Sequence, residues 1–370
     1  METGTPLKKT ILYDRHVSLG AKMAPFGGYL MPISYSGILN EHAAARQAVV
    51  IFDTCHMGEF RISGPGALDD LEQALSCEVG SIRTGRCRYG FITNEAGGVI
   101  DDQVLYRMGN DEFMMVVNAS TKENDFHRLQ NNFSSGTRLE NLSAKTGKLD
   151  LQGPASAGVL KELVELPIDA MKYYQWAKNR YRGQEVLISR TGYTGELGFE
   201  IYAANDLTGV FWDDCLAHGV IPAGLGARDT LRLEMGFPLY GHELDETCNP
   251  AESGYTRAIA AEKQFTGSAI IRDPANRKRS LVGILLDGRR AARHGDTVID
   301  GQGCEIGRVT SGSFSPSLSC AIALGYVAVR ASTIGTEVGI RSERGILSGK
   351  ITGLPFYTKA TGRADLKACR

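Results

Sequence analysis

Two adjacent aspartates inside an apolar stretch are the residues of this chain with the clearest chemical potential. The stretch reads GVIDDQVLY from Gly98 to Tyr106, and its branched and aromatic residues after a glycine pair predict a β-strand. Side chains alternate between the faces of a strand, so Asp102 is expected to share a face with Ile100 and Val104. Asp101 then lies on the opposite face, and Asp102 is the carboxylate among apolar neighbours.

A carboxylate in such a place has an environment suited to catalysis. Poor solvation raises the pKa of a carboxyl group, which makes Asp102 a candidate proton acceptor or a charged contact for a ligand. The alternative is an edge strand with both acids in solvent. Spacing alone does not separate these two interpretations.

A predicted hairpin would bring an aromatic hydroxyl close to this acid. RYGFITN precedes a turn at Glu95 to Gly98 and then the GVIDDQVLY strand, so residues 86–106 are expected to form a β-hairpin. In a pairing closed by that turn, Tyr89 and Asp102 lie near each other across the two strands.

A cation at the start of a predicted helix is a further candidate. GLGARDTLRLEMGFPLYG, from Gly224 to Gly241, reads as a loop that leads into a helix with Arg228 near its start. The helix macrodipole disfavours a positive charge there, which indicates a specific task such as binding an anion. A salt bridge between Arg228 and a neighbouring acid would explain the same position, and the sequence leaves both possibilities open.

Composition and charge restrict the class of protein. The chain has 370 residues, enough for two or three domains, with 42% hydrophobic and 22% charged residues, as in ordinary globular proteins. Its formal net charge of -1 provides no overall field for nucleic acid or an anionic membrane, so we expect neither as a partner. No apolar run approaches the roughly 18 residues of a membrane span.

The sequence lacks the common signatures of metal and nucleotide sites. It contains no HExxH motif, no P-loop and no complete GxGxxG after a strand. Its 8 cysteines form no CxxC pair, which favours reduced thiols and argues against structural zinc or a disulfide framework. We therefore expect no metal site. The lysines near the N-terminus are not followed by an apolar segment, so we expect a cytoplasmic location.

The character of the sequence changes near Ser280. Before this point helical patterns are mixed with strands. After it, short apolar strands alternate with Gly, Asp and Ser turns, which predicts a small all-β barrel or sandwich. The basic loop from Arg272 to Ser280 is the expected domain linker.

Nine stretches of the chain follow one another in a characteristic order. They are LYDRHVSLGAKM, FDTCHMGEF, TNEAGGVIDDQVLY, LQGP, RTGYTGELGFEIY, GLGARDTLRLEMGFPLYG, TSGSFSPSL, ALGYV and LPFY. Together they resemble the aminomethyltransferase family, the T proteins of the glycine cleavage system, from about Leu12 to Tyr357. The ordered set carries the resemblance, and GYTGE with FE and GLGARD is its most specific part.

The resemblance implies an α+β fold of three subdomains arranged as a cloverleaf, with folate in a central hole. Residues 1–275 would form the folate-binding region from two interleaved α+β subdomains, and residues 280–370 would form a C-terminal β-barrel domain. The implied reaction takes the aminomethyl group from the lipoyl arm of the H protein, releases ammonia and passes the methylene unit to tetrahydrofolate. The products would be 5,10-methylene-tetrahydrofolate and dihydrolipoyl H protein.

The resemblance also implies roles for individual residues. Asp102 matches the essential second acid of the family's DD pair, which orients folate near N10 and stabilises positive charge, while Asp101 would be structural. Glu200 would accept two parallel N–H bonds from the pterin, and Arg228 would be the folate-binding arginine. The other folate-binding candidates are aromatic or apolar: Tyr193, Tyr89, Met57, Tyr106, Tyr173 and Tyr174.

Two parts of the chain depart from the family pattern. The C-terminal tail does not reveal which of Tyr357, Lys359 or Arg363 would lie near the lipoyl channel. Phe237 and Tyr240 match the family only loosely.

Two other functions are compatible with this resemblance. A folate-dependent demethylase of a small methylated compound would keep the folate and change the donor. A folate-binding regulatory or assembly protein would lack transferase activity, although the presence of Asp102, Glu200 and Arg228 argues against it. Ammonia release from an aminomethylated H protein, compared with demethylation of a free small molecule, discriminates between the two enzymes.

The implied partner is the lipoylated H protein, which we expect to dock through an acidic surface. Arg83, Arg86 and Arg88 lie within six residues and would form a local positive patch in a chain of nearly neutral charge. A solvated loop would explain these arginines equally well.

Overall fold

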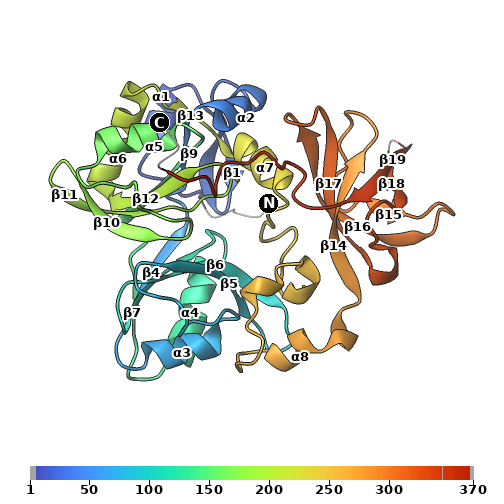
Figure 1. Cartoon of the computed structure of the whole chain (residues 1–370), viewed down its shortest axis with the longest axis horizontal. Coiled ribbons are helices and arrows are strands. Elements are labelled where there is room, and N and C mark those ends of the chain that lie inside the picture. Colours follow the sequence, from blue (N-terminus) through green and yellow to red (C-terminus); the bar gives the residue numbers. More distant parts are fainter. Residues whose placement is uncertain (1–5, 344, 367–370) are drawn as a thin grey trace.

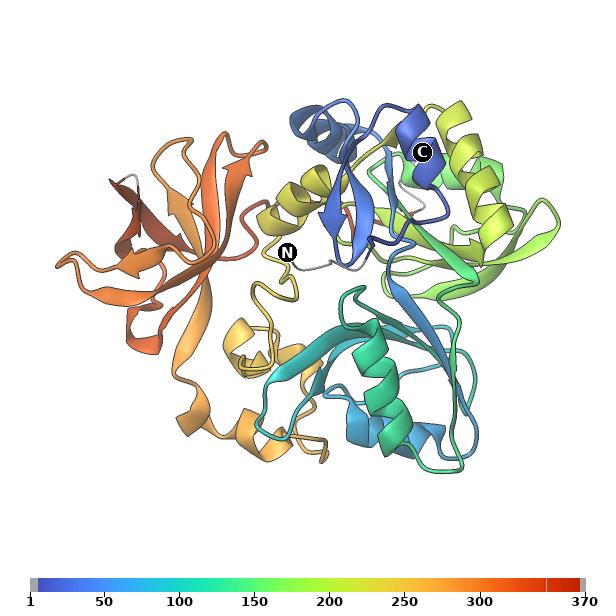
Figure 2. The ribbon, with the colours of Figure 1, turned by 180° about the vertical axis from the view of Figure 1, so that it is seen from behind.

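The chain folds into three lobes, as Figures 1 and 2 show from opposite sides. The computed structural model describes residues 6–343 and 345–366. Two lobes contain a sheet covered by helices, and the third is a closed β-barrel of six strands. The predicted α+β fold of three subdomains with a C-terminal barrel is therefore confirmed. None of the helices in the described residues combines the length and apolar character needed to cross a membrane.

The first lobe contains a six-stranded sheet and is built from two segments of the chain, one before and one after the second lobe. Its strands lie in the order β10-β11-β12-β9-β3-β13. Their bounds are β3 (Val50–Asp53), β9 (Thr146–Gln152), β10 (Trp176–Tyr181), β11 (Gln184–Ser189), β12 (Gly198–Ala204) and β13 (Ile221–Pro222). The remaining elements are α1 (Tyr13–Ser18), the β1 (Lys22–Phe26) and β2 (Tyr29–Ser34) hairpin, α2 (Ile38–Gln47), α5 (Ser156–Leu163), α6 (Asn205–Ala217) and α7 (Leu225–Glu234).

The second lobe is inserted between β3 and β9 of the first. Its sheet has the order β5-β6-β7-β4-β8. The bounds are β4 (Gly58–Ser63), α3 (Ala67–Ala74), β5 (Cys87–Thr93), β6 (Val99–Arg107), β7 (Glu112–Val117), α4 (Lys122–Asn132) and β8 (Arg138–Asn141). Because the chain leaves the first lobe and returns to it, the two α+β lobes are interleaved in sequence.

The predicted hairpin is confirmed as β5 and β6, with one difference in register. Ile92 pairs with Asp101 while Thr93 pairs with Val99, so Ile100 is an extra residue that forms a β-bulge. The bulge turns Ile100 into the buried core of the second lobe, with Leu105. The prediction that Ile100 shares a face with Asp102 is therefore wrong, because the bulge interrupts strict alternation.

A long connection leads from α7 to the barrel along the second lobe. It contains η1 (Pro250–Ser253), η2 (Thr256–Ala258), α8 (Ser268–Arg272) and η3 (Pro274–Asn276). Val99 at the start of β6 donates its backbone N–H to the carbonyl of Asp245. A Cβ on Gly98 would lie 1.7 Å from the carbonyl oxygen of Glu246, so glycine is required where the connection meets the strand.

The barrel consists of six strands in the closed order β14-β17-β16-β15-β18-β19. The bounds are β14 (Arg279–Leu286), β15 (Thr297–Ile299), β16 (Glu305–Ser315), β17 (Cys320–Ala328), η4 (Val329–Ala331), β18 (Glu337–Ser342) and β19 (Gly345–Thr352). The sequence patterns predict all of these strands except β19, which pairs with β14 and β18 and closes the barrel. The division into residues 1–275 and 280–370 stays our proposal for the domain boundary.

Helix α7 connects the first lobe to the barrel through one buried carboxylate. Glu234 accepts hydrogen bonds from Ser315 Oγ at 2.6 Å and from Ser317 N at 3.0 Å, and both serines belong to the barrel. It also forms ion pairs with Arg46 at 2.8 Å and with His42 at 3.3 Å in the first lobe. Burial alone would raise the pKa of Glu234, but these partners lower it from the ordinary value of 4.5 to about 2.

We expect Glu234→Gln to weaken the attachment of the barrel. A neutral amide ends the ion pair with Arg46, which keeps Glu196 as a partner at 2.8 Å, and the loss of one member of a buried ion pair costs about 3 kcal/mol of unfolding free energy. The stabilisation requires an ionised Glu234, so it is complete above about pH 4.5 and is lost as the pH falls toward 2. Urea unfolding followed by circular dichroism near neutral pH and near pH 3 measures this difference.

The control is Glu337→Gln, a loss of the same charge from an exposed position on β18. Its unfolding free energy should stay within about 0.5 kcal/mol of the original protein. A Glu234→Gln protein with unchanged stability near neutral pH would contradict this assignment.

Candidate active site

A cavity of about 1620 Å³ lies where the two α+β lobes meet the connection that follows α7. Residues of the first lobe, of the second lobe, of the segment from Phe237 to Ala258 and of the C-terminal tail line it. Within the described residues, no barrel strand contributes to its wall. Most of the predicted site residues face this cavity.

Asp102 lies half-buried in the cavity wall on β6. Its Oδ2 accepts a hydrogen bond from the Tyr89 hydroxyl at 2.9 Å, so the predicted contact across the hairpin is confirmed. Its Oδ1 accepts a second hydrogen bond, from the side-chain amide of Asn118 at 2.8 Å. The carboxylate is therefore held from two sides and cannot rotate without losing a partner.

Asn118 holds both aspartates of the pair. Its Nδ2 also donates to Asp101 Oδ1 at 2.8 Å, and its backbone N–H donates to Asp101 Oδ2 at 2.9 Å. Asp101 is completely buried behind the wall, in agreement with a structural role. Sequence reasoning missed Asn118, although a polar residue directly after the apolar strand β7 was a usable signal.

The carboxyl groups of this cluster hold their protons more tightly than usual. Burial, followed by the charge of Asp101, raises the pKa of Asp102 from 3.8 to about 7, although Tyr89 and Asn118 partly counteract the rise. Behind it, burial and the Asp101 charge raise the pKa of Asp125 to about 10. Asp102 can therefore gain or lose a proton near neutral pH, as its sequence environment predicts.

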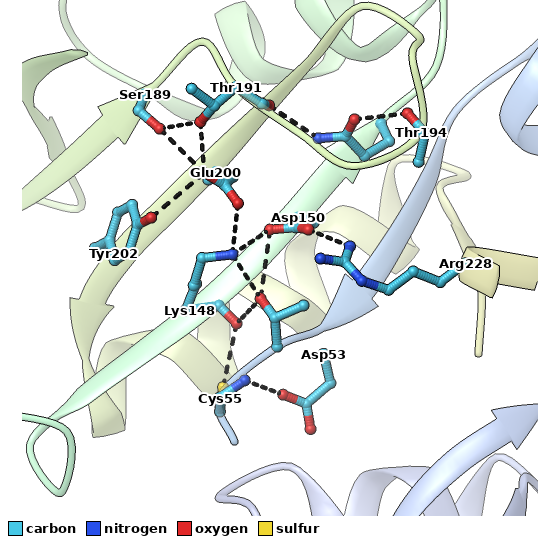
Figure 3. A network of polar contacts seen from close by, with 12 residues as sticks. Asp53, Cys55, Lys148, Asp150, Ser189, Thr191, Thr194, Glu200, Tyr202 and Arg228 are labelled. Carbon is cyan, nitrogen blue, oxygen red and sulfur yellow. Dashed lines mark hydrogen bonds and ion pairs between the residues drawn. The ribbon is translucent and has the colours of Figure 1, made fainter. Parts of the chain in front are cut away.

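Glu200 lies on β12 of the first lobe and belongs to the cavity lining. Figure 3 shows the polar side chains around it. Its Oε1 lies 2.6 Å from Lys148 Nζ. Its Oε2 accepts hydrogen bonds from the hydroxyls of Thr191 and of Tyr106, the latter at 3.2 Å. The hydroxyls of Ser189 and Tyr202 also approach Oε2, at 3.5 and 3.4 Å, so that oxygen is crowded with donors. Among the described residues only Lys148 bonds Oε1, which can accept a further hydrogen bond.

Arg228 satisfies both explanations that its position allowed. Its guanidinium forms an ion pair with Asp150, and it also lines the cavity. Asp150 in turn binds Lys148 Nζ at 2.9 Å. The sequence did not identify Lys148 and Asp150. Both lie on a buried strand, and nothing in its pattern indicates that they contact cavity-lining residues on neighbouring elements.

Aromatic side chains form much of the remaining wall. Tyr193 packs against Phe237 with ring centroids 5.8 Å apart, and the Arg228 guanidinium lies 5.0 Å from the Tyr193 ring. The cavity lining also includes Met57, Tyr89, Tyr173, Tyr174 and Tyr240.

Tyr106 is the predicted folate-binding residue that does not line the cavity. It is completely buried, and its hydroxyl contacts Glu200 at 3.2 Å and Tyr202 at 2.9 Å. The prediction of direct ligand contact is therefore corrected: Tyr106 lies outside the cavity wall and donates a hydrogen bond to Glu200. Strand alternation identified Tyr106 as inward-facing but could not reveal that the first lobe packs against it.

The C-terminal tail returns from the barrel to the first lobe and brings one of its three candidates to the cavity. Arg363 lines the cavity with its guanidinium 5.7 Å from the Tyr173 ring. Tyr357 instead packs against Arg46 at 4.2 Å, and Lys359 is exposed. Arg363 is therefore the tail residue nearest to any ligand.

The three predicted docking arginines all belong to the cavity lining. Arg83 is exposed, while Arg86 and Arg88 are partly buried. Arg88 donates to the carbonyl of Glu78 at 2.7 Å and to Ser81 Oγ at 2.6 Å, which fixes its side chain. In the described part of the chain, no group of three or more His, Cys, Asp or Glu side chains could hold a metal ion.

Comparisons with known proteins agree over nearly the whole chain. Residues 12–263 match the GCVT N-terminal domain family, and residues 279–358 match the glycine cleavage T-protein C-terminal barrel domain family. An aminomethyltransferase from Halothermothrix orenii is 41% identical, over 95% of this chain and 100% of its own length. One from Thermus thermophilus is 44% identical, over 87% of this chain and 91% of its own length.

A solved structure has the same architecture. The crystal structure of glycine cleavage system aminomethyltransferase T from Bartonella henselae superposes with a TM-score of 0.91 at 33% sequence identity. The superposition covers 96% of this chain and 99% of that one. The likeness therefore includes all three lobes.

We expect Asp102→Asn to stabilise the folded protein at mildly alkaline pH. The folded-state pKa of Asp102 lies above its ordinary value, so the folded state loses stability as the pH rises from about 4 toward about 7. A neutral side chain removes the repulsion by Asp101 and should raise the unfolding free energy by about 1–3 kcal/mol near pH 8, and by less near pH 5. Thermal unfolding at the two pH values measures the effect.

The matched control is Asp111→Asn, which removes an exposed carboxylate from the loop before β7. It should change the stability little at either pH. Destabilisation of Asp102→Asn near pH 8 would show that Asp102 is not a strained, proton-retaining group.

Proposed function

The chain belongs to the glycine cleavage T-protein family and is an aminomethyltransferase of that system, and from this premise we propose how its cavity works. The cavity takes tetrahydrofolate as the acceptor and the aminomethyl-lipoyl arm of the H protein as the donor. The methylene unit passes to the folate, ammonia is released, and dihydrolipoyl H protein remains. One observation carries the proposal: a carboxyl group poised to titrate near neutral pH faces a cavity that also presents Glu200 and Arg228.

The size and chemistry of the cavity fit these two reactants. Its volume of about 1620 Å³ exceeds the roughly 300–1,000 Å³ of a site for one small ligand, so it has room for a folate and a lipoyl arm together. Tyr89, Tyr173 and Tyr193 offer aromatic faces for flat rings. Arg83, Arg86 and Arg363 form what we call the rim of the cavity. Their guanidinium groups can bind the carboxylates of a folate tail.

Glu200 provides the element of specificity. Its carboxylate is buried except for the surface it turns to the cavity, so a ligand that reaches it must supply donors. A 2-amino-pyrimidinone offers two adjacent N–H groups, which match a carboxylate that accepts two parallel bonds. A ring without those donors would leave a desolvated charge unpaired, which disfavours its binding.

Asp102 acts by position and charge. A bound tetrahydrofolate would supply the nucleophilic nitrogen atoms that take up the methylene unit. Asp102 would accept a hydrogen bond from the folate near N10 and stabilise the positive charge that develops beside it. Tyr89 and Asn118 hold the carboxylate in place, so it does not reorient as the reaction proceeds.

The cysteines support the proposed cytoplasmic location. The cysteines of the described residues are all free thiols, and most are buried. Such thiols are typical of a reducing compartment.

We expect Asp102→Asn to bind tetrahydrofolate nearly as well as the original protein and to lose turnover by about 100-fold or more. The amide preserves the size of the side chain and one acceptor oxygen, but it replaces the other oxygen with a donor and lacks the charge that stabilises the transition state. Ammonia release from aminomethylated H protein, together with folate binding by fluorescence quenching, measures the two properties separately. A near-normal rate would contradict the role of Asp102.

The same assay tests the identity of the donor. An aminomethyltransferase releases ammonia only with the aminomethylated H protein, whereas a demethylase would act on a free methylated compound without it. Activity of the second kind alone would favour the demethylase.

We expect Arg83→Glu and Arg86→Glu to weaken the interaction with the H protein. Reversing a charge at the rim replaces attraction to an acidic partner with repulsion, and the KM for H protein should rise about tenfold, with less effect at high salt. The control is Arg330→Glu on the exposed end of the barrel. Equal effects of rim and barrel substitutions would contradict docking at the rim.

A further inference from the structure

Two buried residues, Lys148 and Asp150, connect Glu200 to Arg228, two side chains of the cavity wall (Figure 3). Lys148 is completely buried, and its Nζ lies 2.6 Å from Glu200 Oε1 and 2.9 Å from Asp150 Oδ1. The other oxygen of Asp150 accepts a hydrogen bond from Arg228. The result is a network of ion pairs in which the sign of the charge alternates, Glu200–Lys148–Asp150–Arg228. Lys148 and Asp150 do not line the cavity themselves.

These contacts favour the charged forms of the two buried members, Lys148 and Asp150. Burial alone would lower the pKa of Lys148, but Asp150 and Glu200 outweigh it and raise that pKa. Burial alone would raise the pKa of Asp150, but Lys148 and Arg228 outweigh it and lower that pKa. Two positive and two negative groups balance, so none is left as an unpaired buried charge.

The balance depends most on Lys148. It lies between two carboxylates, and its third contact is the neutral hydroxyl of Thr54 at 3.3 Å. Without the ammonium group, Glu200 and Asp150 would face each other in a low dielectric. Asp150 would still be paired with Arg228. Among the described residues, Glu200 would retain only hydroxyl donors, and all of them bond its Oε2.

We propose that Lys148 is a positioning residue that fixes the charge and orientation of Glu200 and thereby sets the affinity for the pterin of the acceptor. The inference rests on the proposed function. Lys148 touches neither the reacting atoms nor the cavity, so it acts through Glu200 alone. Its effect should therefore fall on folate binding and leave the chemical step nearly unchanged.

The test is Lys148→Met, which keeps the length of the side chain and removes the charge. The dissociation constant and the KM for tetrahydrofolate should rise about 10- to 100-fold, as expected for the loss of a charge-assisted hydrogen bond that organises the site. The kcat at saturating folate should stay within about threefold. Fluorescence quenching by tetrahydrofolate gives the dissociation constant without turnover.

A double-mutant cycle separates this role from a general loss of structure. Glu200→Gln on its own should weaken folate binding, and Lys148→Met added to it should weaken binding by less than about threefold further. The double variant also replaces the ion pair by neutral groups, so it should fold even if Lys148→Met alone does not. In that event, the comparison of the double variant with Glu200→Gln still decides the question.

Lys178→Met is the matched control. Lys178 lies in the same sheet and also forms an ion pair, with Glu185, but both side chains are exposed. Its removal should leave the dissociation constant for tetrahydrofolate unchanged, and melting curves of all variants report their folding.

The outcomes distinguish this inference from the proposed function. If the original protein binds no tetrahydrofolate, the proposed function fails and the inference fails with it. If the original protein binds it and Lys148→Met binds it equally well, only the inference is overturned. Additive effects of Lys148→Met and Glu200→Gln, or a fall in kcat with an unchanged KM, would also overturn it.

Discussion

A buried carboxylate must either be paired with a cation or keep its proton, and this constraint organises the whole molecule. Asp150 and Glu234 have cations within reach, so their pKa values are lowered and they act as permanent charges that join elements. Asp102 and Asp125 have no such cation among the described residues, and burial together with the charge of Asp101 raises their pKa values. Neutral donors such as Tyr89 and Asn118 orient Asp102 without fixing its protonation state. The cost of burying a charge thus explains both the ion pairs of Asp150 and Glu234 and the raised pKa of Asp102.

Helix α7 shows how the ligand site and the architecture share elements. The residue before its first turn is Gly224, whose backbone N–H donates to the buried Glu41 and whose missing side chain allows β2 to approach. Its first turns carry Arg228 to the cavity, and its last residue, Glu234, is bonded to the barrel. The buried face of the helix packs Leu231 against the first lobe. A shift of the barrel would therefore be transmitted along one rigid helix to the position of Arg228.

The sequence predicts the local features of this site better than the contacts between lobes. Composition and alternation are sufficient for the β5–β6 hairpin and the Tyr89–Asp102 contact, because a tight turn determines which residues meet. The bulge at Ile100 escapes prediction because a single extra residue leaves no compositional trace. Lys148 and Glu200 are separated by 52 positions, and the sequence does not show that their strands are neighbours. The helix-start position of Arg228 conflicts with the local preference for negative charge, and the structure places this guanidinium in an ion pair with Asp150 and in the cavity wall.

A single strand sets the spacing between Asp102 and Glu200, the two carboxylates for which we propose catalytic and recognition roles. Asp102 and Tyr106 both lie on β6 of the second lobe, while Glu200 lies on β12 of the first. The hydroxyl of Tyr106 reaches across the junction to Glu200, and its ring packs there in a shared apolar cluster with residues of both lobes. A strand rises about 3.3 Å per residue, so the four-residue step from Asp102 to Tyr106 acts as a fixed spacer between the two acids. The proposed catalytic and recognition groups can thus keep a fixed spacing across a wide cavity, although they come from different lobes.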